Sequence, residues 1–247
     1  LSQFNNGAYV TDANYYLGCI YYTQNNYDQA RTHLQSVAEQ HNSKYCEEAT
    51  RMVAGLAYNQ RDYSLAMKSY GDLIGITNNP QSKLHAQIHR LRSAQAIANL
   101  DIILEETATV LANTKLSPET AIELRYYRAK AQLAKKKNED AIEDLSVLAG
   151  DTRNTYGAEA KYLLAQLYYD TRRYEKAEQE VLDYINVSTP HSYWLARSFV
   201  LLSDVYVKKE MPIEAKQYLL SLKQSYQAND DIATMIEERL QALASAQ

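Results

Sequence analysis

The amino-acid sequence predicts an all-α fold built from stacked antiparallel helix pairs. Three observations predict it: a unit of about 37 residues recurs along most of the chain, apolar residues within each unit keep helical spacing, and the four prolines lie at the ends of predicted helices. The repeat is the most informative of the three, because a recurring unit of this length is typical of proteins built from stacked repeats.

The repeat is clearest in three segments, where a small residue is followed nine residues later by Tyr and twelve residues later by Ala. We call the small residue the crossing position and the residue twelve further on the anchor position. The predicted crossing positions are Gly18, Ala54, Arg92, Ala129, Ala165 and Ser203. The predicted anchor positions are Ala30, Ala66, Leu104, Ala141, Ala177 and Ala215, at steps of 36, 38, 37, 36 and 38 residues. Six repeats therefore fill residues 10–228, and the third is the least regular because neither of its positions is small.

Each repeat is predicted to form two helices. In the first helix, apolar residues such as Leu17 and Tyr21 recur with the 3.6-residue period of an α-helix. After a short polar stretch, the second helix places Ala30, Leu34 and Val37 on one face. Small residues at the crossing and anchor positions let two antiparallel backbones approach closely, so that larger neighbours interdigitate. Strand-like alternation of useful length is absent from the sequence, which leaves the helical hairpin as the repeating element.

Composition supports a globular helical protein and limits its partners. Of the 247 residues, 46% are hydrophobic and 23% are charged, which suffices for a sizeable core. The net charge of −4 is too small for a nucleic-acid-binding arm, so no nucleic-acid partner is expected. No apolar run approaches 18 residues, so no membrane span is predicted.

The first repeat carries the pattern Leu17-Gly18-x-x-Tyr21, and the fifth carries Leu164-Ala165-x-x-Tyr168. With the second-helix residues that follow, this pattern resembles the tetratricopeptide repeat. The resemblance implies a right-handed superhelical solenoid of antiparallel helix pairs, here with six repeats and a C-terminal helix. The chain departs from the family in its longer step, since the usual period is about 34 residues, and in lacking an early tryptophan in the first helix.

The two ends of the chain are read from the same pattern. Residues 1–9 are interpreted as the tail of a preceding repeat, which suggests a longer parent protein. Residues 229–247 are predicted to form a helix that caps the stack or opens a seventh repeat, because Ile232, Ile236 and Leu243 share one apolar stripe. The long step and tyrosine-rich junctions also resemble repeat proteins of the bacterial cell envelope, including the lipoprotein subunit of the outer-membrane β-barrel assembly machinery. A periplasmic or cell-envelope location is therefore expected, with the cytoplasm left open.

Two histidines and two cysteines are the candidates for catalytic or metal-binding chemistry in the sequence. His85 and His89 lie one helical turn apart, but the zinc-protease pattern needs Glu after the first His, where Ala86 stands. The pair is interpreted as solvated or groove-lining, and Cys19 and Cys46 as buried small side chains. Phosphate-binding loops and nucleophile elbows are absent from the sequence. We therefore expect a non-enzymatic protein without a cofactor or a metal.

The expected binding surface follows from the family resemblance, which implies that the first helices line a concave groove. The predicted partner-binding residues are Tyr15, Tyr22, Arg51, Tyr58, Tyr126, Lys130, Tyr162, Gln166, Tyr169, Arg197 and Asp204. Tyrosine offers a large rigid contact area with a hydroxyl group, which suits peptide recognition.

Two functions and one structural reading remain open for these tyrosines. The first function is a scaffold that binds a protein or peptide partner in the groove. The alternative is a small-molecule or glycan-binding helical module, which would need one aromatic cluster in a closed pocket. The spread of the tyrosines over four repeats favours the first. In the structural reading, the 22 tyrosines simply replace phenylalanine in a packed stack.

Overall fold

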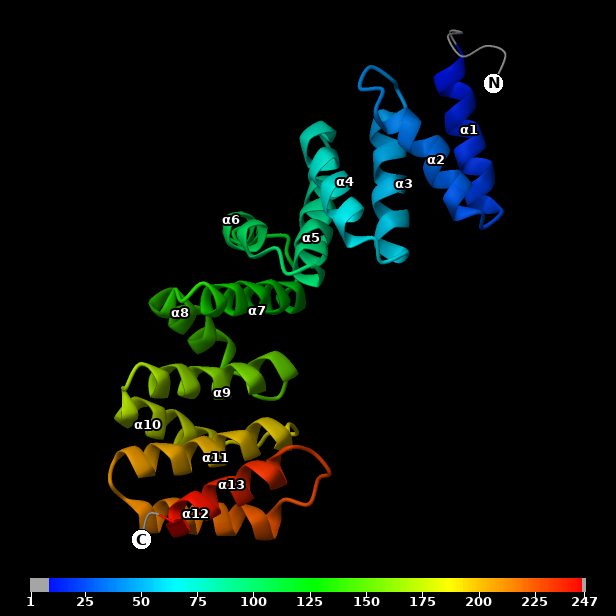
Figure 1. Ribbon diagram of the computed structural model, residues 1–247. Coiled ribbons are helices and arrows are strands. Elements are labelled where there is room, and N and C mark those ends of the chain that lie inside the picture. Colours follow the sequence, from blue (N-terminus) through cyan, green and yellow to red (C-terminus); the bar gives the residue numbers. More distant parts are fainter. Residues whose placement is uncertain (1–8, 246–247) are drawn as a thin grey trace. The chain divides into compact units, whose positions relative to one another are not determined.

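The computed structural model describes residues 9–245, and every regular element in this range is a helix (Figure 1). The chain divides into two compact units, Leu1–Leu116 and Ser117–Gln247. Unit 1 contains α1 (Val10–Thr23), α2 (Tyr27–Ala38), α3 (Cys46–Asn59), α4 (Tyr63–Ile76), α5 (Pro80–Ala96) and α6 (Leu100–Leu111). Unit 2 contains α7 (Pro118–Ala134), α8 (Asn138–Leu148), α9 (Thr155–Asp170), α10 (Tyr174–Ile185), α11 (Ser192–Lys208), α12 (Pro212–Ser225) and α13 (Ile232–Ser245).

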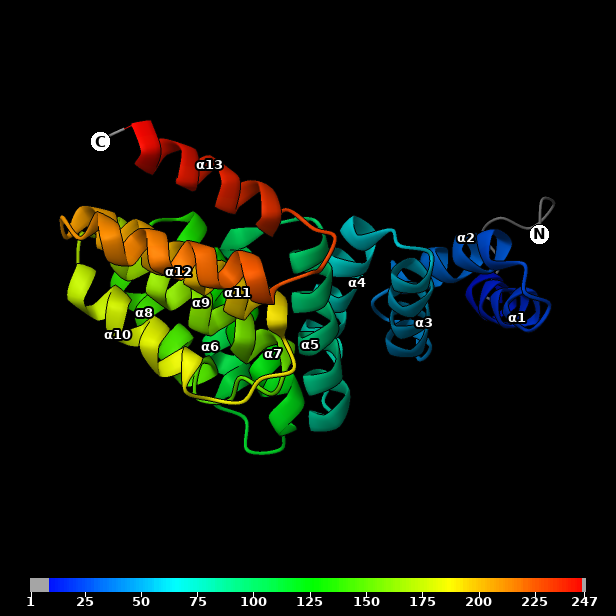
Figure 2. The same cartoon turned by 90° about the horizontal axis from the view of Figure 1, so that it is seen from below.

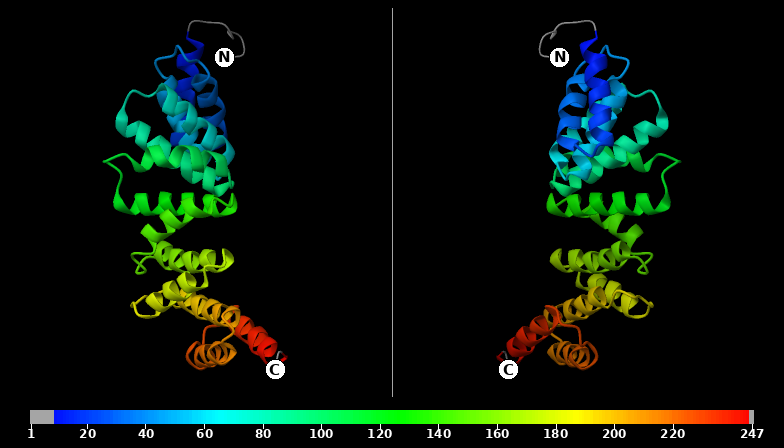
Figure 3. Two further views of the ribbon diagram at one scale, coloured as in Figure 1. Left: turned by 90° about the vertical axis from the view of Figure 1, so that its left-hand side faces the viewer. Right: turned by 90° about the vertical axis from the view of Figure 1, so that its right-hand side faces the viewer.

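The helices form six hairpins, three in each unit, and α13 follows the last one. Within unit 1, α3 packs against α2 and α4, and α5 packs against α4 and α6 (Figure 3). Within unit 2, α9 packs against α8 and α10, and α11 against α10 and α12. The helices α3, α5, α9 and α11, which are the first helices of their hairpins, therefore each pack against the second helix of the preceding hairpin and the second helix of their own. This is the arrangement of a helical repeat solenoid.

The turn inside each hairpin has the same backbone conformation. One residue of every turn has a φ between 54° and 62°, and these residues are Asn25, Arg61, Ala98, Lys136, Arg172 and Glu210. This left-handed conformation ends the first helix in the manner of a C-terminal cap. In unit 1, the residue just before each second helix caps its N-terminus. These N-cap residues are Asn26, Asp62 and Asn99, and their side chains accept hydrogen bonds from backbone N–H groups three residues later.

The turns also correct the predicted register of the third repeat. In the other five repeats the left-handed residue lies seven positions after the crossing position, and Ala98 therefore assigns Leu91 to that role. Leu91 and Ile103 are fully buried, whereas the predicted Arg92 and Leu104 are only half-buried. The prediction was wrong by one residue because it looked for small side chains, and this repeat fills both positions with large aliphatic ones.

The core lies along the hairpin crossings, as the small residues predicted. The anchor residues Ala30, Ala66, Ala141, Ala177 and Ala215 have no exposed surface. At the crossing position Gly18, a Cβ atom would come within 2.6 Å of Leu34 Cγ. The absence of a side chain at Gly18 therefore permits the close contact between α1 and α2.

Enlarging an anchor residue should overpack a crossing. In the variant Ala177→Phe, the new ring would enter a site that Leu145 and Leu164 already fill. We expect the free energy of unfolding to fall by about 1–3 kcal/mol. Urea unfolding followed by the fluorescence of Trp194, which lies in the same unit, measures the change. An unchanged midpoint would contradict the assignment of Ala177 to the crossing.

Of the two chain ends, the structure describes mainly the C-terminal one. Residues 1–8, which hold most of the proposed tail of a preceding repeat, lie outside the described residues. At the other end, α13 lies along α11 and α12 (Figure 2). Its residues Ile232 and Ile236 are buried in one cluster with Val200 and Leu219.

Candidate partner-binding surface

All eleven predicted partner-binding residues lie on the first helices of their hairpins. They occupy α1 and α3 in unit 1, and α7, α9 and α11 in unit 2. We call this side of each unit the first-helix face. None of the eleven lies on α5, the first helix of the third repeat.

Three of the predicted tyrosines pack against the next repeat. Tyr15 stacks on Tyr45 with ring centroids 4.1 Å apart and planes inclined by 8°. The corresponding ring centroids are 4.7 Å apart for Tyr126 and Tyr156, and 5.7 Å apart for Tyr162 and Trp194. We call these three contacts the junction ring pairs. In each pair, an aromatic residue in the first helix of one repeat contacts an aromatic residue at the start of the first helix of the next repeat.

The sequence carries a signal for these pairs in the spacing of its aromatic residues. Tyr45, Tyr156 and Trp194 each precede a crossing position by nine residues. Tyr15, Tyr126 and Tyr162 each precede one by three. Because successive first helices pack side by side, two aromatic positions at fixed offsets in each repeat meet across the junction. These tyrosines therefore contribute to packing between repeats, as the structural reading proposed.

Charged residues of unit 2 add polar contacts to the junction ring pairs. Lys130 Nζ lies 3.0 Å from Glu159 Oε1. Burial, together with a hydrogen bond to Glu159, raises the pKa of Tyr126. At the next junction Arg197 donates to the hydroxyl oxygens of Tyr162, at 3.3 Å, and Tyr193, at 2.9 Å. The guanidinium also lies over the Tyr162 ring, 5.0 Å from its centroid.

Helix α13 and the residue that precedes it contact two predicted residues of α11, Asp204 and Arg197. Arg239 donates from Nε and Nη2 to the two carboxylate oxygens of Asp204, both at 2.8 Å. Asp231 lies 3.4 Å from the guanidinium of Arg197. Gln166, in turn, accepts from the Tyr162 hydroxyl at 3.1 Å and donates to Asp170 at 2.9 Å. On the first-helix face of unit 2, the predicted polar residues thus have partners within the unit.

The remaining predicted tyrosines lie at the turn end of the first helices. Tyr22, Tyr58 and Tyr169 each contact the tyrosine five residues further on, with centroids 5.6–5.9 Å apart. Tyr22 keeps 42% of its surface exposed. It also lines a cavity of about 210 Å³ with Asn59 at the end of α3 and Gln60 just after it. Tyr22 is therefore accessible to a partner.

Unit 1 has a second cavity on its first-helix face, of about 240 Å³, between α3 and the start of α5. Its lining residues are Arg51, Leu73, Asn79, Gln81, Ser82 and His85. Arg51 is 53% exposed and donates to Glu48 through Nε at 3.0 Å. Burial, followed by the charges of Arg51 and Arg92, lowers the pKa of His85. The imidazole therefore stays neutral to a lower pH than a free histidine, beside a positively charged side chain.

The remaining chemical candidates are two histidines and two cysteines. The rings of His85 and His89 have centroids 4.3 Å apart. Within residues 9–245, no group of three His, Cys, Asp or Glu side chains is placed to hold a metal ion. Cys19 and Cys46 are free, and the Cys46 thiol donates to the carbonyl of Ala38 at 3.3 Å. None of the helices α1–α13 has the length and apolar character needed to cross a bilayer.

Comparisons with known proteins identify the repeat. Residues 12–41 and residues 128–193 each match a tetratricopeptide repeat family. A search of curated protein sequences gives no match.

Solved structures share the fold at low sequence identity. One is a Podosopora anserina protein whose TPR-like repeats are nearly identical to one another. It superposes on this chain with a TM-score of 0.52 and 16% identity, and the match covers 74% of this chain and 96% of that protein. The C-terminal part of a TPR repeat-containing protein from Cytophaga hutchinsonii gives 0.51 and 15%, covering 94% and 96%. The two matched segments are therefore tetratricopeptide repeats, and the chain shares the all-α helical repeat fold of these solved structures.

Proposed function

We propose that this protein is a non-enzymatic scaffold that binds a protein or peptide partner on the first-helix face of unit 1. The observation that carries the proposal is the cavity beside Arg51, which places an exposed cation next to an imidazole. Tetratricopeptide repeats generally serve protein–protein interaction, and a stack of helices suits an extended segment because the surface is long and modular.

The charges of this region favour a partner segment with an acidic side chain. Arg51 and Arg92 both act on His85 as positive charges, and Arg51 is more than half exposed although it contacts Glu48. A carboxylate from the partner would add a second acceptor for the Arg51 guanidinium, which has several donor groups. Tyr22, on the same face, would supply a contact for an apolar or aromatic side chain.

The distribution of aromatic residues supports a protein partner over a glycan. The junction ring pairs and the turn-end tyrosines are spread over several repeats and do not form one aromatic cluster. A sugar site would present one aromatic cluster with a free ring face. A periplasmic or cell-envelope location stays a prediction.

A charge reversal at Arg51 tests the proposal. Partners captured from an extract of the source organism by the wild-type chain should be lost with Arg51→Glu, because the new carboxylate repels an acidic segment. They should be retained by Lys216→Glu, which makes the same change at an exposed position of α12. Quantitative mass spectrometry of the captured proteins measures the difference, and circular dichroism checks that both variants fold. Equal capture by the two variants would contradict the proposed surface.

A further inference from the structure

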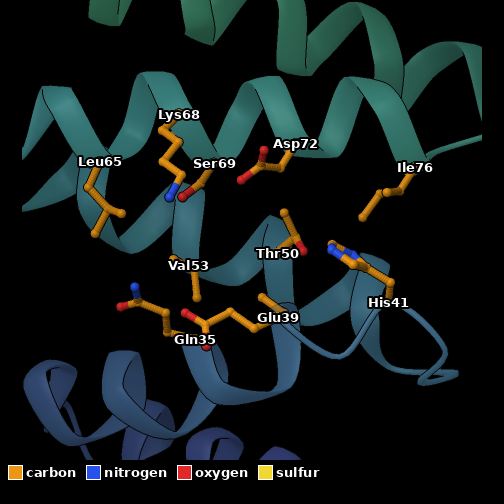
Figure 4. Close-up of a pocket in the computed structure, with 11 residues that line it drawn as sticks. Gln35, Glu39, His41, Thr50, Val53, Leu65, Lys68, Ser69, Asp72 and Ile76 are labelled. Atoms are coloured by element: carbon orange, nitrogen blue, oxygen red, sulfur yellow. The ribbon is translucent and has the colours of Figure 1, made fainter.

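A cavity of about 310 Å³ lies between α2, α3 and α4, away from the first-helix residues discussed above (Figure 4). Its floor is formed by Thr50 and Val53 of α3, and Leu65 and Ile76 of α4 add apolar walls. Charged side chains surround the opening. Figure 4 shows Lys68 and Asp72 on α4, with Glu39 on the opposite side, just after α2.

The cavity exists because one recurring side-chain pair is short in the second repeat. In four other repeats, the residue four before the crossing position contacts the residue three after the anchor position. These pairs are Asn14–His33 at 2.8 Å, Arg125–Asp144 at 3.0 Å, Lys161–Glu180 at 2.6 Å, and the rings of Phe199 and Tyr218 with centroids 6.2 Å apart. The second repeat has Thr50 and Ser69 at these positions. The cavity is thus the space that longer side chains occupy elsewhere in the chain.

One polar group in this cavity lacks a partner. Ser69 is only 6% exposed and lines the cavity, yet its hydroxyl makes no hydrogen bond within residues 9–245. The Thr50 hydroxyl already donates to the carbonyl of Cys46 at 2.8 Å, which leaves its oxygen able to accept. The Ser69 hydroxyl therefore opens into the cavity, where the donor group of a ligand can reach it.

The charges around the opening are also unpaired. Glu39, Lys68 and Asp72 form no ion pair or hydrogen bond with any side chain in the described part of the protein. At the equivalent positions of the fifth repeat, Gln179 donates to Asp183 at 2.7 Å. The opening therefore carries two carboxylates against one ammonium group, with the His41 imidazole beside them, and its charge favours a cation.

The fourth and fifth repeats show which kinds of cation fit this environment. At the position of Thr50, the fourth repeat has the guanidinium group of Arg125, which donates to Asp144 at 3.0 Å and keeps 27% of its side chain exposed. The fifth repeat has the ammonium group of Lys161, which pairs with Glu180 and keeps 13% of its side chain exposed. The cavity in the second repeat offers the same combination of apolar walls and carboxylates without the cation. We propose that this cavity binds an alkylguanidinium group, the chemistry shared by a free guanidino compound and an arginine side chain of a partner protein. The planar group would donate to Asp72 and to the Ser69 hydroxyl, Glu39 would add negative charge at the opening, and the stem would lie against Val53 and Leu65.

Methyl-group NMR of the whole chain tests the proposal with two probes. Agmatine represents a free guanidino compound, and acetyl-Gly-Arg-Gly-amide represents an arginine of a partner. We expect at least one of them to shift the methyl signals of Val53, Leu65 and Ile76. Binding of the peptide alone would assign the site to a partner protein, whereas binding of both would show that a free compound suffices. The same peptide with uncharged citrulline in place of arginine should give no shift.

Substitutions around the opening give opposite expected effects. Asp72→Asn should weaken binding about tenfold, because it removes a charged acceptor. Lys68→Met should strengthen binding by removing the competing cation. The matched control, Asp183→Asn at the equivalent position of the fifth repeat, should leave the affinity unchanged.

A second test fills the cavity. Thr50→Lys with Ser69→Glu copies the pair of the fifth repeat and should abolish the shifts while the helical signal is retained. If this double variant does not fold, Asp72→Asn decides the question alone. The proposal is overturned if neither probe shifts the cavity methyl signals, if the citrulline peptide acts like the arginine peptide, or if Asp72→Asn binds as the wild type does.

Discussion

Replacing Asp144 by alanine should lower the free energy of unfolding by about 3 kcal/mol, because it removes the acceptor of two arginines at once. Asp144 is only 1% exposed. Arg128 donates to its two oxygens at 2.7 Å each, and Arg125 donates at 3.0 Å. Arg128 and Arg125 keep only 19% and 27% of their side-chain surface exposed. In the variant, both guanidinium groups would be left without their main partner in a place that water reaches poorly.

Urea unfolding followed by Trp194 fluorescence and by circular dichroism would measure this change. The matched control is Glu143→Ala, which removes a neighbouring exposed carboxylate and should alter stability by less than about 0.5 kcal/mol. If Asp144→Ala unfolds at the same urea concentration as the control, the two ion pairs make no net contribution to the fold.

The hairpins could be predicted from the sequence because they depend on local patterns. Helical periodicity and the small residues at the crossings act within about 20 residues of chain, and the family resemblance added the stacking of one hairpin on the next. The third repeat shows the limit of this approach. A crossing can be made with Leu91 and Ile103 as well as with two alanines, and the sequence alone does not say which of two adjacent residues faces the core.

The binding surface was predicted less well than the fold. The eleven residues lie on the expected helices, but sequence position does not show what a side chain contacts. Tyr15 and Tyr162 face the next repeat, and Asp204 meets an arginine 35 residues further along the chain. The cavity between α2 and α4 was also missed, because it results from two short side chains whose significance appears only beside the equivalent pairs of other repeats.

Tyr162 distinguishes most clearly between a binding role and a packing role for the predicted tyrosines. It is 9% exposed, its ring contacts the Trp194 ring and the Arg197 guanidinium group, and its hydroxyl donates to Gln166. Tyr162→Ala should therefore leave a cavity at the junction of the fifth and sixth repeats and lower the free energy of unfolding by about 3–4 kcal/mol. Circular dichroism in urea is the appropriate measurement, because Trp194 fluorescence would change with the loss of its neighbour.

Two further variants separate the causes of this effect. Tyr162→Phe keeps the ring and removes the hydroxyl, so it should cost only about 1 kcal/mol, and Arg197 would retain its hydrogen bond to Tyr193. Tyr22→Ala, at a tyrosine with 42% of its surface exposed, should cost about 1 kcal/mol or less, because little buried area is lost. If Tyr162→Ala were no more destabilising than Tyr22→Ala, the ring of Tyr162 would not hold the junction together. Its place on the first-helix face would then favour contact with a partner, as the sequence first suggested.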